Sequence, residues 1–317
     1  MTNTKILTAV IPNVFQVDMR LDRVLAKLFF EYSRTYLKKC ILNRQICING
    51  IVFNKPNIKV SCGDIVTVKI ISNANINHPQ DIPLNIIYED NDILIIDKPD
   101  NLVVHPGAGH KDGTLLNGLL YKSNKFINVP RSGIVHRLDK NTTGLMVIAK
   151  NIFSYNTLIR SMKSREIIRQ YEAIVHGKMI SGGSISFPIK RHSSRRTIMT
   201  IGIRGREAIT HYRIIKRFSF CTHLMVKLET GRTHQIRVHM LNINHPLIGD
   251  REYGNKYKYC RYINSSTHNI VKNFPRQALH ASKLLLKHPR TCSWMEWNSS
   301  IPEDILNLLN HLNKNNV

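Results

Sequence analysis

The chain has 317 residues, of which 42% are hydrophobic, so it can form one sizeable core and a smaller second domain. Its 46 Lys and Arg residues against 21 Asp and Glu residues give a formal net charge of +25, which favours a polyanion such as nucleic acid as partner. No stretch approaches the roughly 18 consecutive apolar residues of a membrane span, and the first residues lack a signal-peptide pattern. These features argue against a membrane protein and predict a soluble, cytoplasmic one.

The positive charge has a second explanation, because the chain is rich in Ile, Asn and Lys, as an AT-biased coding sequence would make it. The arginines gather in particular stretches, however, and this favours the nucleic-acid partner. The cysteines show no Cys-x-x-Cys spacing and no close pairing with histidine, so we expect neither a zinc site nor disulfides. They are interpreted as reduced residues: Cys40, Cys47, Cys62, Cys221, Cys260 and Cys292.

The sequence of the first part of the chain predicts a compact module at residues 18–75. Apolar residues from Leu21 to Phe29 recur at helical spacing, and Ser33 can cap a second, basic helix that runs to about residue 43. Asn49 and Gly50 predict the turn of a β-hairpin, and an alternating strand follows at 65–70. The polar, proline-containing stretch after it predicts a linker, placed at residues 76–83.

The sequence pattern of residues 84–312 predicts a larger α+β domain. Many strands with few helices between them favour a mixed, largely antiparallel sheet over a doubly wound parallel sheet. The predicted strands lie at about 86–90, 93–99, 144–149, 169–175, 185–189, 197–201, 207–216, 223–229 and 279–286. Helices are predicted after Thr114, at 151–164, at 233–242 and from Pro302 onward.

One acid stands out in the stretch GIVHRLDKNTTGLMVIAK, residues 133–150. Asp139 lies between Arg137 and Lys140, Thr142 and Thr143 can tie the loop to itself, and a glycine leads into a buried strand. An acid with a chemical role needs such a rigid turn and a cation that favours its charged form. Taken alone, an Asp in a turn is more often a structural hydrogen-bonding residue.

This stretch resembles the central H-R-L-D motif of the pseudouridine synthases that act on large-subunit ribosomal RNA. The later motifs of that family have similar counterparts in the same order: RQYEAIVHG (169–177), LETGRTHQIRVHM (228–240), HPLIGDREYG (245–254) and RQALHASKLLLKHP (276–289). The N-terminal module is similar to the small αL-type RNA-binding domain, first known from a small-subunit ribosomal protein, that precedes several of these synthases. The resemblance covers nearly the whole chain.

The segments HRLDKNTTGLMVIAK, VVHPGAG and QDIPLNIIYEDNDILIIDKP most resemble the branch of the family that modifies clustered uridines in helix 69 of that RNA. The resemblance therefore implies an isomerase of ribosomal RNA. Converting uridine to pseudouridine involves no redox change and loses no group, so no cofactor or metal is expected, and the sequence contains no P-loop. Asn141 departs from the family, where an acid is expected, and residues 255–275 match weakly and are interpreted as a basic surface loop.

The resemblance also implies roles for single residues. Asp139 falls on the catalytic aspartate, which attacks the ribose or base or withdraws a ribose proton, and Arg237 falls on the arginine that pairs with it. Tyr171 falls on the tyrosine that stacks on the flipped uracil and helps to remove the proton from its carbon 5. Arg137 falls on a residue thought to fill the space left in the RNA, and its neighbour His136 is included in the predicted RNA contacts. Outside the motifs, Tyr171 could be a core aromatic and Arg237 could bind phosphate or a surface acid.

Basic side chains predict further RNA contacts. The segment 190–206 concentrates Lys and Arg without an acid, which favours a clamp on RNA phosphates over a merely solvated hairpin. By analogy with related domains, the second helix of the N-terminal module has the same interpretation. The predicted contacts are Arg191, Arg195 and Arg196 in the first segment and Arg34, Lys38 and Arg44 in the second.

Several alternatives remain open. A sister synthase would share the chemistry and act on other ribosomal or transfer-RNA uridines, and a ribosome-assembly factor could keep the fold without catalysis. A base deaminase is disfavoured because the H-x-E and P-C-x-x-C zinc signature is lacking. A Rossmann methyltransferase is disfavoured because the glycine spacing of PGAGHKDG is wrong. A monomer is the expected state.

Overall fold

The computed structural model describes residues 3–13, 19–29, 32, 34–72, 78–107, 109–254 and 265–314. The chain forms two compact units, unit 1 at residues 1–77 and unit 2 at residues 78–317. Ser33, Cys260 and residues 73–77 and 255–264 lie outside the described residues, so the expected helix cap, that cysteine and part of the expected linker are among them. The expected domain bounds stay predictions.

The described residues of unit 1 form two helices and six strands. Helix α1 (Leu21–Leu28) buries the apolar face that the sequence predicts, and Leu37 and Ile41 of helix α2 (Arg34–Leu42) complete the same core. The predicted hairpin turn is confirmed, with positive φ angles of 48° at Asn49 and 81° at Gly50. A four-stranded sheet has the order β1-β6-β3-β4, and β2 pairs with β5: β1 (Asn3–Val10), β2 (Met19–Arg20), β3 (Ile46–Ile48), β4 (Ile51–Phe53), β5 (Lys59–Val60) and β6 (Ile65–Ser72). The sequence interpretation missed β1, an edge strand that pairs with β6 alone.

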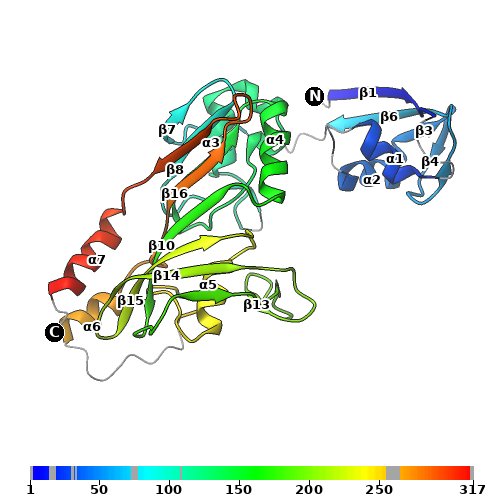
Figure 1. Ribbon diagram of the computed structural model, residues 1–317. Coiled ribbons are helices and arrows are strands. Elements are labelled where there is room, and N and C mark those ends of the chain that lie inside the picture. Colours follow the sequence, from blue (N-terminus) through cyan, green and yellow to red (C-terminus); the bar gives the residue numbers. More distant parts are fainter. Residues whose placement is uncertain are drawn as a thin grey trace. The chain divides into compact units, whose positions relative to one another are not determined.

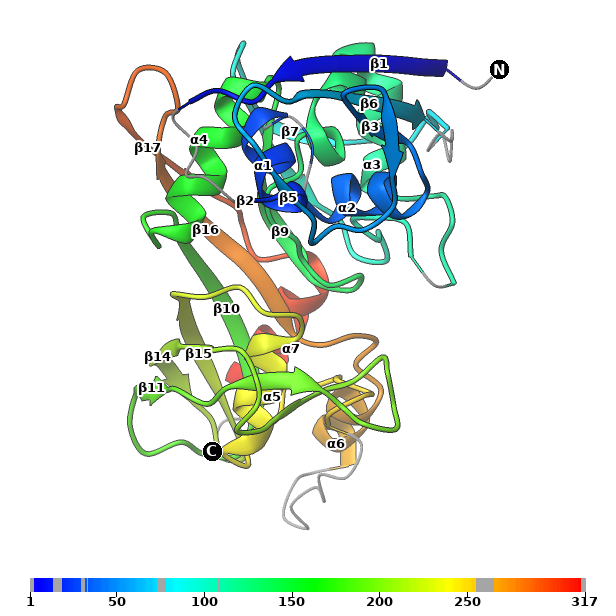
Figure 2. The ribbon, with the colours of Figure 1, turned by 90° about the vertical axis from the view of Figure 1, so that its right-hand side faces the viewer.

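Unit 2 is built on one large sheet (Figures 1 and 2). Its order is β11-β14-β15-β10-β16-β9-β8-β7, with β17 also paired to β16, and only β16 and β9 run parallel. The mixed, largely antiparallel sheet that the sequence predicts is therefore confirmed. The strands are β7 (Asn85–Glu89), β8 (Ile93–Lys98), β9 (Thr143–Ala149), β10 (Ile168–His176), β11 (Gly183–Ile185), β14 (Thr210–Arg217), β15 (Cys221–Leu228), β16 (Leu279–Lys287) and β17 (Trp294–Asn298).

Helices cover both faces of this sheet. Helices α3 (Leu115–Lys122) and α5 (Gln235–Asn242) share a core cluster with alternate residues of β8, β10 and β15, including Tyr171. The residues between them on β8 and β10 pack on the opposite face, against α4 (Ile152–Lys163) at one end and α6 (Ser265–Lys272) and α7 (Glu303–Lys314) at the other. The alternation places Tyr171 on the α3 and α5 side. Two short 3-10 turns lie at Asn124–Asn128 and Pro130–Gly133.

Some expectations for unit 2 are wrong. Residues 255–275 were expected to form only a surface loop, but α6 lies within them, because Val271 and Phe274 are buried against α7. The expected strand at 185–189 is divided into β11 and a separate hairpin of β12 (Ile189–Arg191) and β13 (Met199–Ile201), because Pro188 cannot donate a ladder hydrogen bond. Strand β17 was missed, since it is a mostly exposed edge strand.

One close approach fixes the loop before β9. Gly144 has a φ angle of +115°, and a Cβ atom there would lie 2.3 Å from the carbonyl oxygen of Ala281 on β16. Only glycine therefore allows β9 to begin its parallel pairing with β16 at this point. Because Asp139 precedes this glycine by five residues, the sheet itself sets the position of the acidic loop. Among the described residues, no helix is both long and apolar enough to cross a membrane.

Candidate active site

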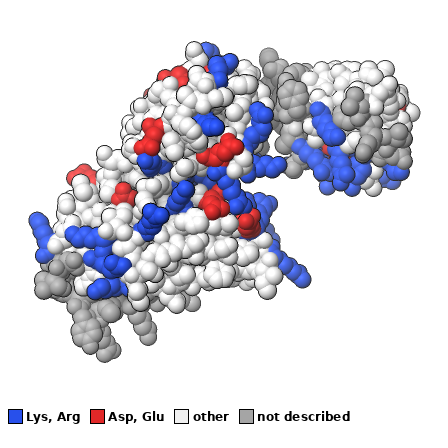
Figure 3. Space-filling model, in the orientation of Figure 1, with Lys and Arg blue, Asp and Glu red and all other residues white. Residues whose placement is uncertain are grey.

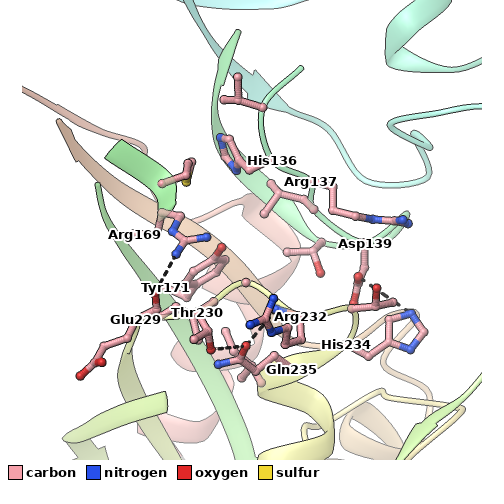
Figure 4. A pocket seen from close by; sticks show the side chains of 18 of the residues that line it. His136, Arg137, Asp139, Arg169, Tyr171, Glu229, Thr230, Arg232, His234 and Gln235 are labelled. Carbon is pink, nitrogen blue, oxygen red and sulfur yellow. Dashed lines mark hydrogen bonds and ion pairs between the residues drawn. The ribbon is translucent and has the colours of Figure 1, made fainter. Parts of the chain in front are cut away.

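A cavity of about 790 Å³ opens on unit 2 where the loop before β9 meets the first residues of β10 and the end of β15 (Figure 4). Its size lies within the range of ligand-binding pockets. The cavity is lined by Asp139, Tyr171 and Arg237, which come from a loop, a strand and a helix that are far apart in the sequence. The tertiary structure therefore brings together the three residues that were expected to act chemically.

The loop that carries Asp139 is held by hydrogen bonds on both sides. The amide of Thr142 donates to the Asp139 carbonyl at 3.1 Å, which closes the turn. The threonine side chains were expected to tie the loop to itself, but they bind the start of β16 instead: Gln277 Nε2 donates to Thr142 Oγ1 at 3.1 Å, and Thr143 Oγ1 lies 2.9 Å from His280 Nδ1. The loop is thus anchored to the sheet.

A buried lysine at the end of β8 also holds this loop. Lys98, at the end of β8, is 1% exposed, and its Nζ donates to the carbonyls of Pro99, Leu102 and Lys140. The three acceptors match the three N–H donors of an ammonium group. Burial nevertheless lowers the pKa of Lys98 to about 7, because the charged form loses its hydration. Lys98 therefore links the residue after Asp139 to the sheet, and its charge depends on pH.

Arg237 is shared by three carboxylates. Its Nη1 lies 3.2 Å from Asp139 Oδ2, its Nε and Nη2 donate to both oxygens of Asp250 at 2.6 and 2.8 Å, and Nη2 also donates to Glu252 at 2.7 Å. Burial alone would lower the pKa of Arg237, but its hydrogen bonds to Asp250 and the negative charges of the three acids raise the pKa above its ordinary value. The guanidinium stays charged and is oriented mainly by Asp250, whose carboxylate is fully buried.

Two consecutive hydrogen bonds connect the β12–β13 hairpin to His234, which lies beside Asp139. The amide of Met199 donates to the Tyr253 hydroxyl at 2.8 Å, and this hydroxyl lies 2.8 Å from His234 Nδ1. The Tyr253 hydroxyl can donate its own proton to Nδ1, and in that arrangement the neutral His234 ring carries its proton on Nε2. That atom lies 3.9 Å from Asp139 Oδ1. Burial lowers the pKa of His234, which favours the neutral ring beside the carboxylate.

Tyr171 lies on the cavity side of β10, opposite Val226 of β15, and is 5% exposed. The pKa of its phenol is raised, mainly because the side chain is buried. The charge of Arg169 opposes this increase, and the charge of Asp139 adds to it. The side chain is therefore a neutral phenol at neutral pH. An aromatic face in a cavity of this size is suited to stacking on a flat base.

The residues predicted to contact RNA lie in three places. Arg137 is exposed at the cavity, whereas His136 accepts a hydrogen bond from the Val147 amide through Nε2 and has its Nδ1 buried. Burial and the Arg169 charge lower the pKa of His136 to about 3, so it is neutral. Arg191, Arg195 and Arg196 are exposed on the β12–β13 hairpin, outside the cavity lining.

The third set lies in unit 1. Lys38 and Arg44 are exposed on α2 and directly after it, and Figure 3 shows Lys and Arg side chains gathered on one side of this unit. Arg34, which was predicted to contact RNA, is also paired within the unit, because its Nη2 lies 2.6 Å from Asp22, a buried acid of α1. Arg20 contacts the same carboxylate, so Arg34 has a role in holding α1 to α2.

The part of the chain that the structure describes holds no cluster of His, Cys, Asp and Glu able to bind a metal. The five described cysteines are free thiols, and Cys40 and Cys221 are buried.

Comparison with known proteins supports this picture. Residues 92–242 match the RNA pseudouridylate synthase family, and residues 19–66 match the S4 domain. A "Ribosomal large subunit pseudouridine synthase D" of Buchnera aphidicola subsp. Baizongia pistaciae is 54% identical over 99% of this chain and 100% of its own length. The chain belongs to the RNA pseudouridine synthase family. It is therefore an isomerase with an N-terminal S4 domain.

Other relatives of this synthase carry the same name. The protein from Yersinia pestis is 49% identical over 94% of this chain and 92% of its own length, and that from Escherichia coli strain K12 is 48% identical over 93% and 90%. Among solved structures, "Human RNA Pseudouridylate Synthase Domain Containing 4" covers 72% of this chain and 93% of its own chain, with a TM-score of 0.56 and 23% identity. That likeness concerns the fold.

Sequence reasoning missed several residues of the synthase site. Asp250 and Glu252 lie in the motif HPLIGDREYG, which was noticed without a role for its acids. His234 was given no role, and Lys98 was part of a predicted strand. Nothing in their spacing shows that a guanidinium or a carbonyl cluster lies beside them, since their partners are distant in sequence.

Proposed function

We propose that this pseudouridine synthase isomerises uridines of large-subunit ribosomal RNA, namely those of helix 69. The relatives that span nearly the whole chain are named for the large ribosomal subunit, and the motif resemblance narrows the target to helix 69. The observation that carries the proposal is the ion pair between Asp139 and the buried Arg237, in a cavity that Tyr171 also lines. The proposal also includes a cytoplasmic location and a monomeric state. The monomer is expected because one chain supplies all three residues.

The chemistry assigns one task to each residue. The bond between ribose C1′ and uracil N1 breaks, the uracil turns, a bond forms between C1′ and C5, and the proton of C5 is lost while N1 gains one. Asp139 starts the reaction in one of two ways: it attacks the ribose or the uracil base as a nucleophile, or it removes a proton from the ribose. Both roles require a carboxylate. Arg237 provides a positive charge 3.2 Å from that carboxylate and cannot lose its own proton in the process.

The uridine must leave its helix before this can happen. Extruding a base costs a few kcal/mol, and stacking on an aromatic side chain returns about 1–3 kcal/mol. Tyr171 provides this surface, and its raised pKa keeps it a neutral phenol while the base enters. Removal of the C5 proton with help from the Tyr171 hydroxyl remains a prediction. The exposure of Arg137 at the cavity supports the prediction that this side chain fills the space that the uridine leaves.

A non-catalytic RNA-binding factor is the alternative from another class. The arrangement of charges argues against it, because three carboxylates around Arg237 would repel phosphates and add nothing to binding alone. A sister synthase with other target uridines is the alternative within the family, and it would use the same site.

One experiment tests the activity and the target together. The protein is produced in a bacterial strain that lacks its own helix 69 synthase, and pseudouridines are mapped along the ribosomal RNA. We expect modification of helix 69 with the wild-type protein and none with Asp139→Asn, whose RNA affinity should stay within a few-fold. Pseudouridine only at other positions would support the sister synthase, and turnover by Asp139→Asn near the wild-type rate would reject the role of Asp139.

A further inference from the structure

Unit 2 contains a buried arginine whose charge has no acidic partner among the described residues. Arg169 is two residues before Tyr171 on β10, so the two side chains emerge on the same face of the strand, about 7 Å apart at the backbone. Arg169 is 7% exposed and lines the cavity (Figure 4). Its charge lowers the pKa values of both His136 and Tyr171, in line with a guanidinium that lies close to both rings.

The other two buried arginines of the described chain are bound by carboxylates. Arg237 contacts Asp250 through two nitrogens, and Arg276 contacts Asp304 in the same way at 2.7 and 2.8 Å. Arg169 has a single hydrogen bond, from Nη2 to the carbonyl of Glu229 at 3.4 Å, and its Nε is buried without a partner among the described residues. A buried charge left in this state is costly.

The nearby acid is already occupied. The Glu229 carboxylate lies 2.9 Å from Arg165 and 2.7 Å from His211, and Figure 4 shows it directed away from Arg169. Asp139, the other acid that lines the cavity, pairs with Arg237. Within the cavity lining, Arg169 therefore has donors and a positive charge that no protein group satisfies.

The backbone leaves room for this guanidinium. A Cβ atom on Gly231 would lie 2.6 Å from Arg169 Nη1, so the guanidinium occupies the space that a side chain would fill there. Gly231 has no positive φ angle, which means that its role here is the space it leaves and not an unusual backbone conformation. The cavity is thus shaped to hold Arg169 in place before any ligand binds.

We propose that Arg169 binds a backbone phosphate of the extruded uridine or of its immediate neighbour. A phosphate is the anion that RNA offers, and guanidinium groups bind it with two parallel hydrogen bonds. The position beside Tyr171 would fix the nucleotide at its phosphate while the base stacks on the phenol. This inference rests on the proposed function, since it assumes an RNA substrate, and it makes Arg169 a positioning residue.

The test uses a synthetic helix 69 stem-loop in which one phosphate at a time near the target uridines is replaced by an uncharged methylphosphonate. Binding is measured with Asp139→Asn protein, so that no turnover occurs. We expect one or two replacements to weaken binding by about 10- to 100-fold with Arg169 present, and to have no further effect in the Arg169→Gln protein. Equal losses in both proteins at every position would overturn the proposal.

Further measurements separate this contact from other causes. Gly231→Ala should push the guanidinium aside and so reduce the sensitivity of binding to methylphosphonate, as Arg169→Gln does, but only in part. The control is Arg213→Gln, which removes an exposed charge on β14 outside the cavity lining. This variant should keep the full sensitivity to methylphosphonate. Arg169→Gln should unfold at a temperature equal to or above that of the wild type, because an unpaired buried charge is lost; a clear decrease would indicate a structural role instead. Pseudouridine formation by the wild-type enzyme in the unmodified stem-loop shows separately whether the proposed substrate is right.

Discussion

At the scale of single residues, the site depends on how one guanidinium is shared. Arg237 meets Asp139 through one nitrogen at 3.2 Å, while Asp250 holds two of its nitrogens at shorter distances. Asp139, the acid expected to act chemically, therefore binds Arg237 less tightly than Asp250 does. Such a division suits catalysis, because Asp250 fixes the arginine and leaves Asp139 free to react with a substrate.

This division predicts the effect of Asp250→Asn. The substitution keeps the shape but removes the charge that orients Arg237, so we expect kcat to fall at least 10-fold and RNA affinity to stay within about 3-fold. The free energy of unfolding should fall by about 2 kcal/mol, as is usual for a lost hydrogen bond to a charged group. Glu252→Gln is the matched control, since its carboxylate is 41% exposed and its ion pair contributes little. Single-turnover kinetics and urea unfolding measure both effects, and equal effects of the two substitutions would contradict this account.

At the scale of elements, the acidic loop is positioned by its surroundings. Gly144 lets β9 approach β16, the threonines bind the start of β16, and Lys98 binds the carbonyl of Lys140 from the end of β8. The contacts of Gly144 and the threonines are with the start of β16, and that of Lys98 comes from the end of β8. The sheet therefore holds the loop from two strands, as a preorganised site requires.

Lys98 makes the stability of this arrangement depend on pH. Its pKa is lowered from 10.5 to about 7 by burial, so between these values the unfolded chain binds more protons than the folded chain. The contribution of Lys98 to the free energy of unfolding should then rise from pH 7 to pH 10.5, by at most about 1.4 kcal/mol per pH unit. Urea unfolding of the wild type and of Lys98→Met at pH 7.5 and 9.5 isolates this contribution, because the other groups are common to both. Identical pH slopes would show that Lys98 keeps its ordinary pKa.

At the scale of the whole molecule, the net charge of +25 is distributed unevenly. Figure 3 shows Lys and Arg side chains on one side of unit 1 and around the hollow of unit 2, where acids also lie. The β12–β13 hairpin carries arginines outside the cavity, and the Tyr253 hydroxyl connects its backbone to His234. We expect this hairpin to grip RNA phosphates beyond the extruded nucleotide.

The hairpin is tested by the salt dependence of binding. Replacing Arg195 and Arg196 by Gln should reduce the slope of log affinity against log salt by about 0.7–0.9 for each lost phosphate contact, because fewer counterions are released. The control replaces Arg213 and Lys314, two exposed cations on β14 and α7, and should leave the slope unchanged. Filter binding at four salt concentrations provides the slopes. A slope equal to that of the wild type after the first replacement would assign the hairpin another role.

The local pattern of the sequence was enough for most elements of the fold. Helical spacing predicted α1, the Asn49-Gly50 pair predicted its hairpin, and Thr114 predicted the start of α3, because each depends on neighbours within a few residues. The errors concern elements stabilised by distant partners, such as α6, which is a helix because Val271 and Phe274 pack against α7.

For the site, the sequence determined the family through its ordered motifs, and with it the expectation that Asp139, Tyr171 and Arg237 act together. It could not determine which groups complete the site. Asp250 holds Arg237, Lys98 supports the loop, and Arg169 has no acidic partner among the described residues, and each of these facts depends on which side chains meet across the sheet. Burial and charge pairing are properties of the packed chain, so only the tertiary structure could show which charges are satisfied and which one is left for a ligand.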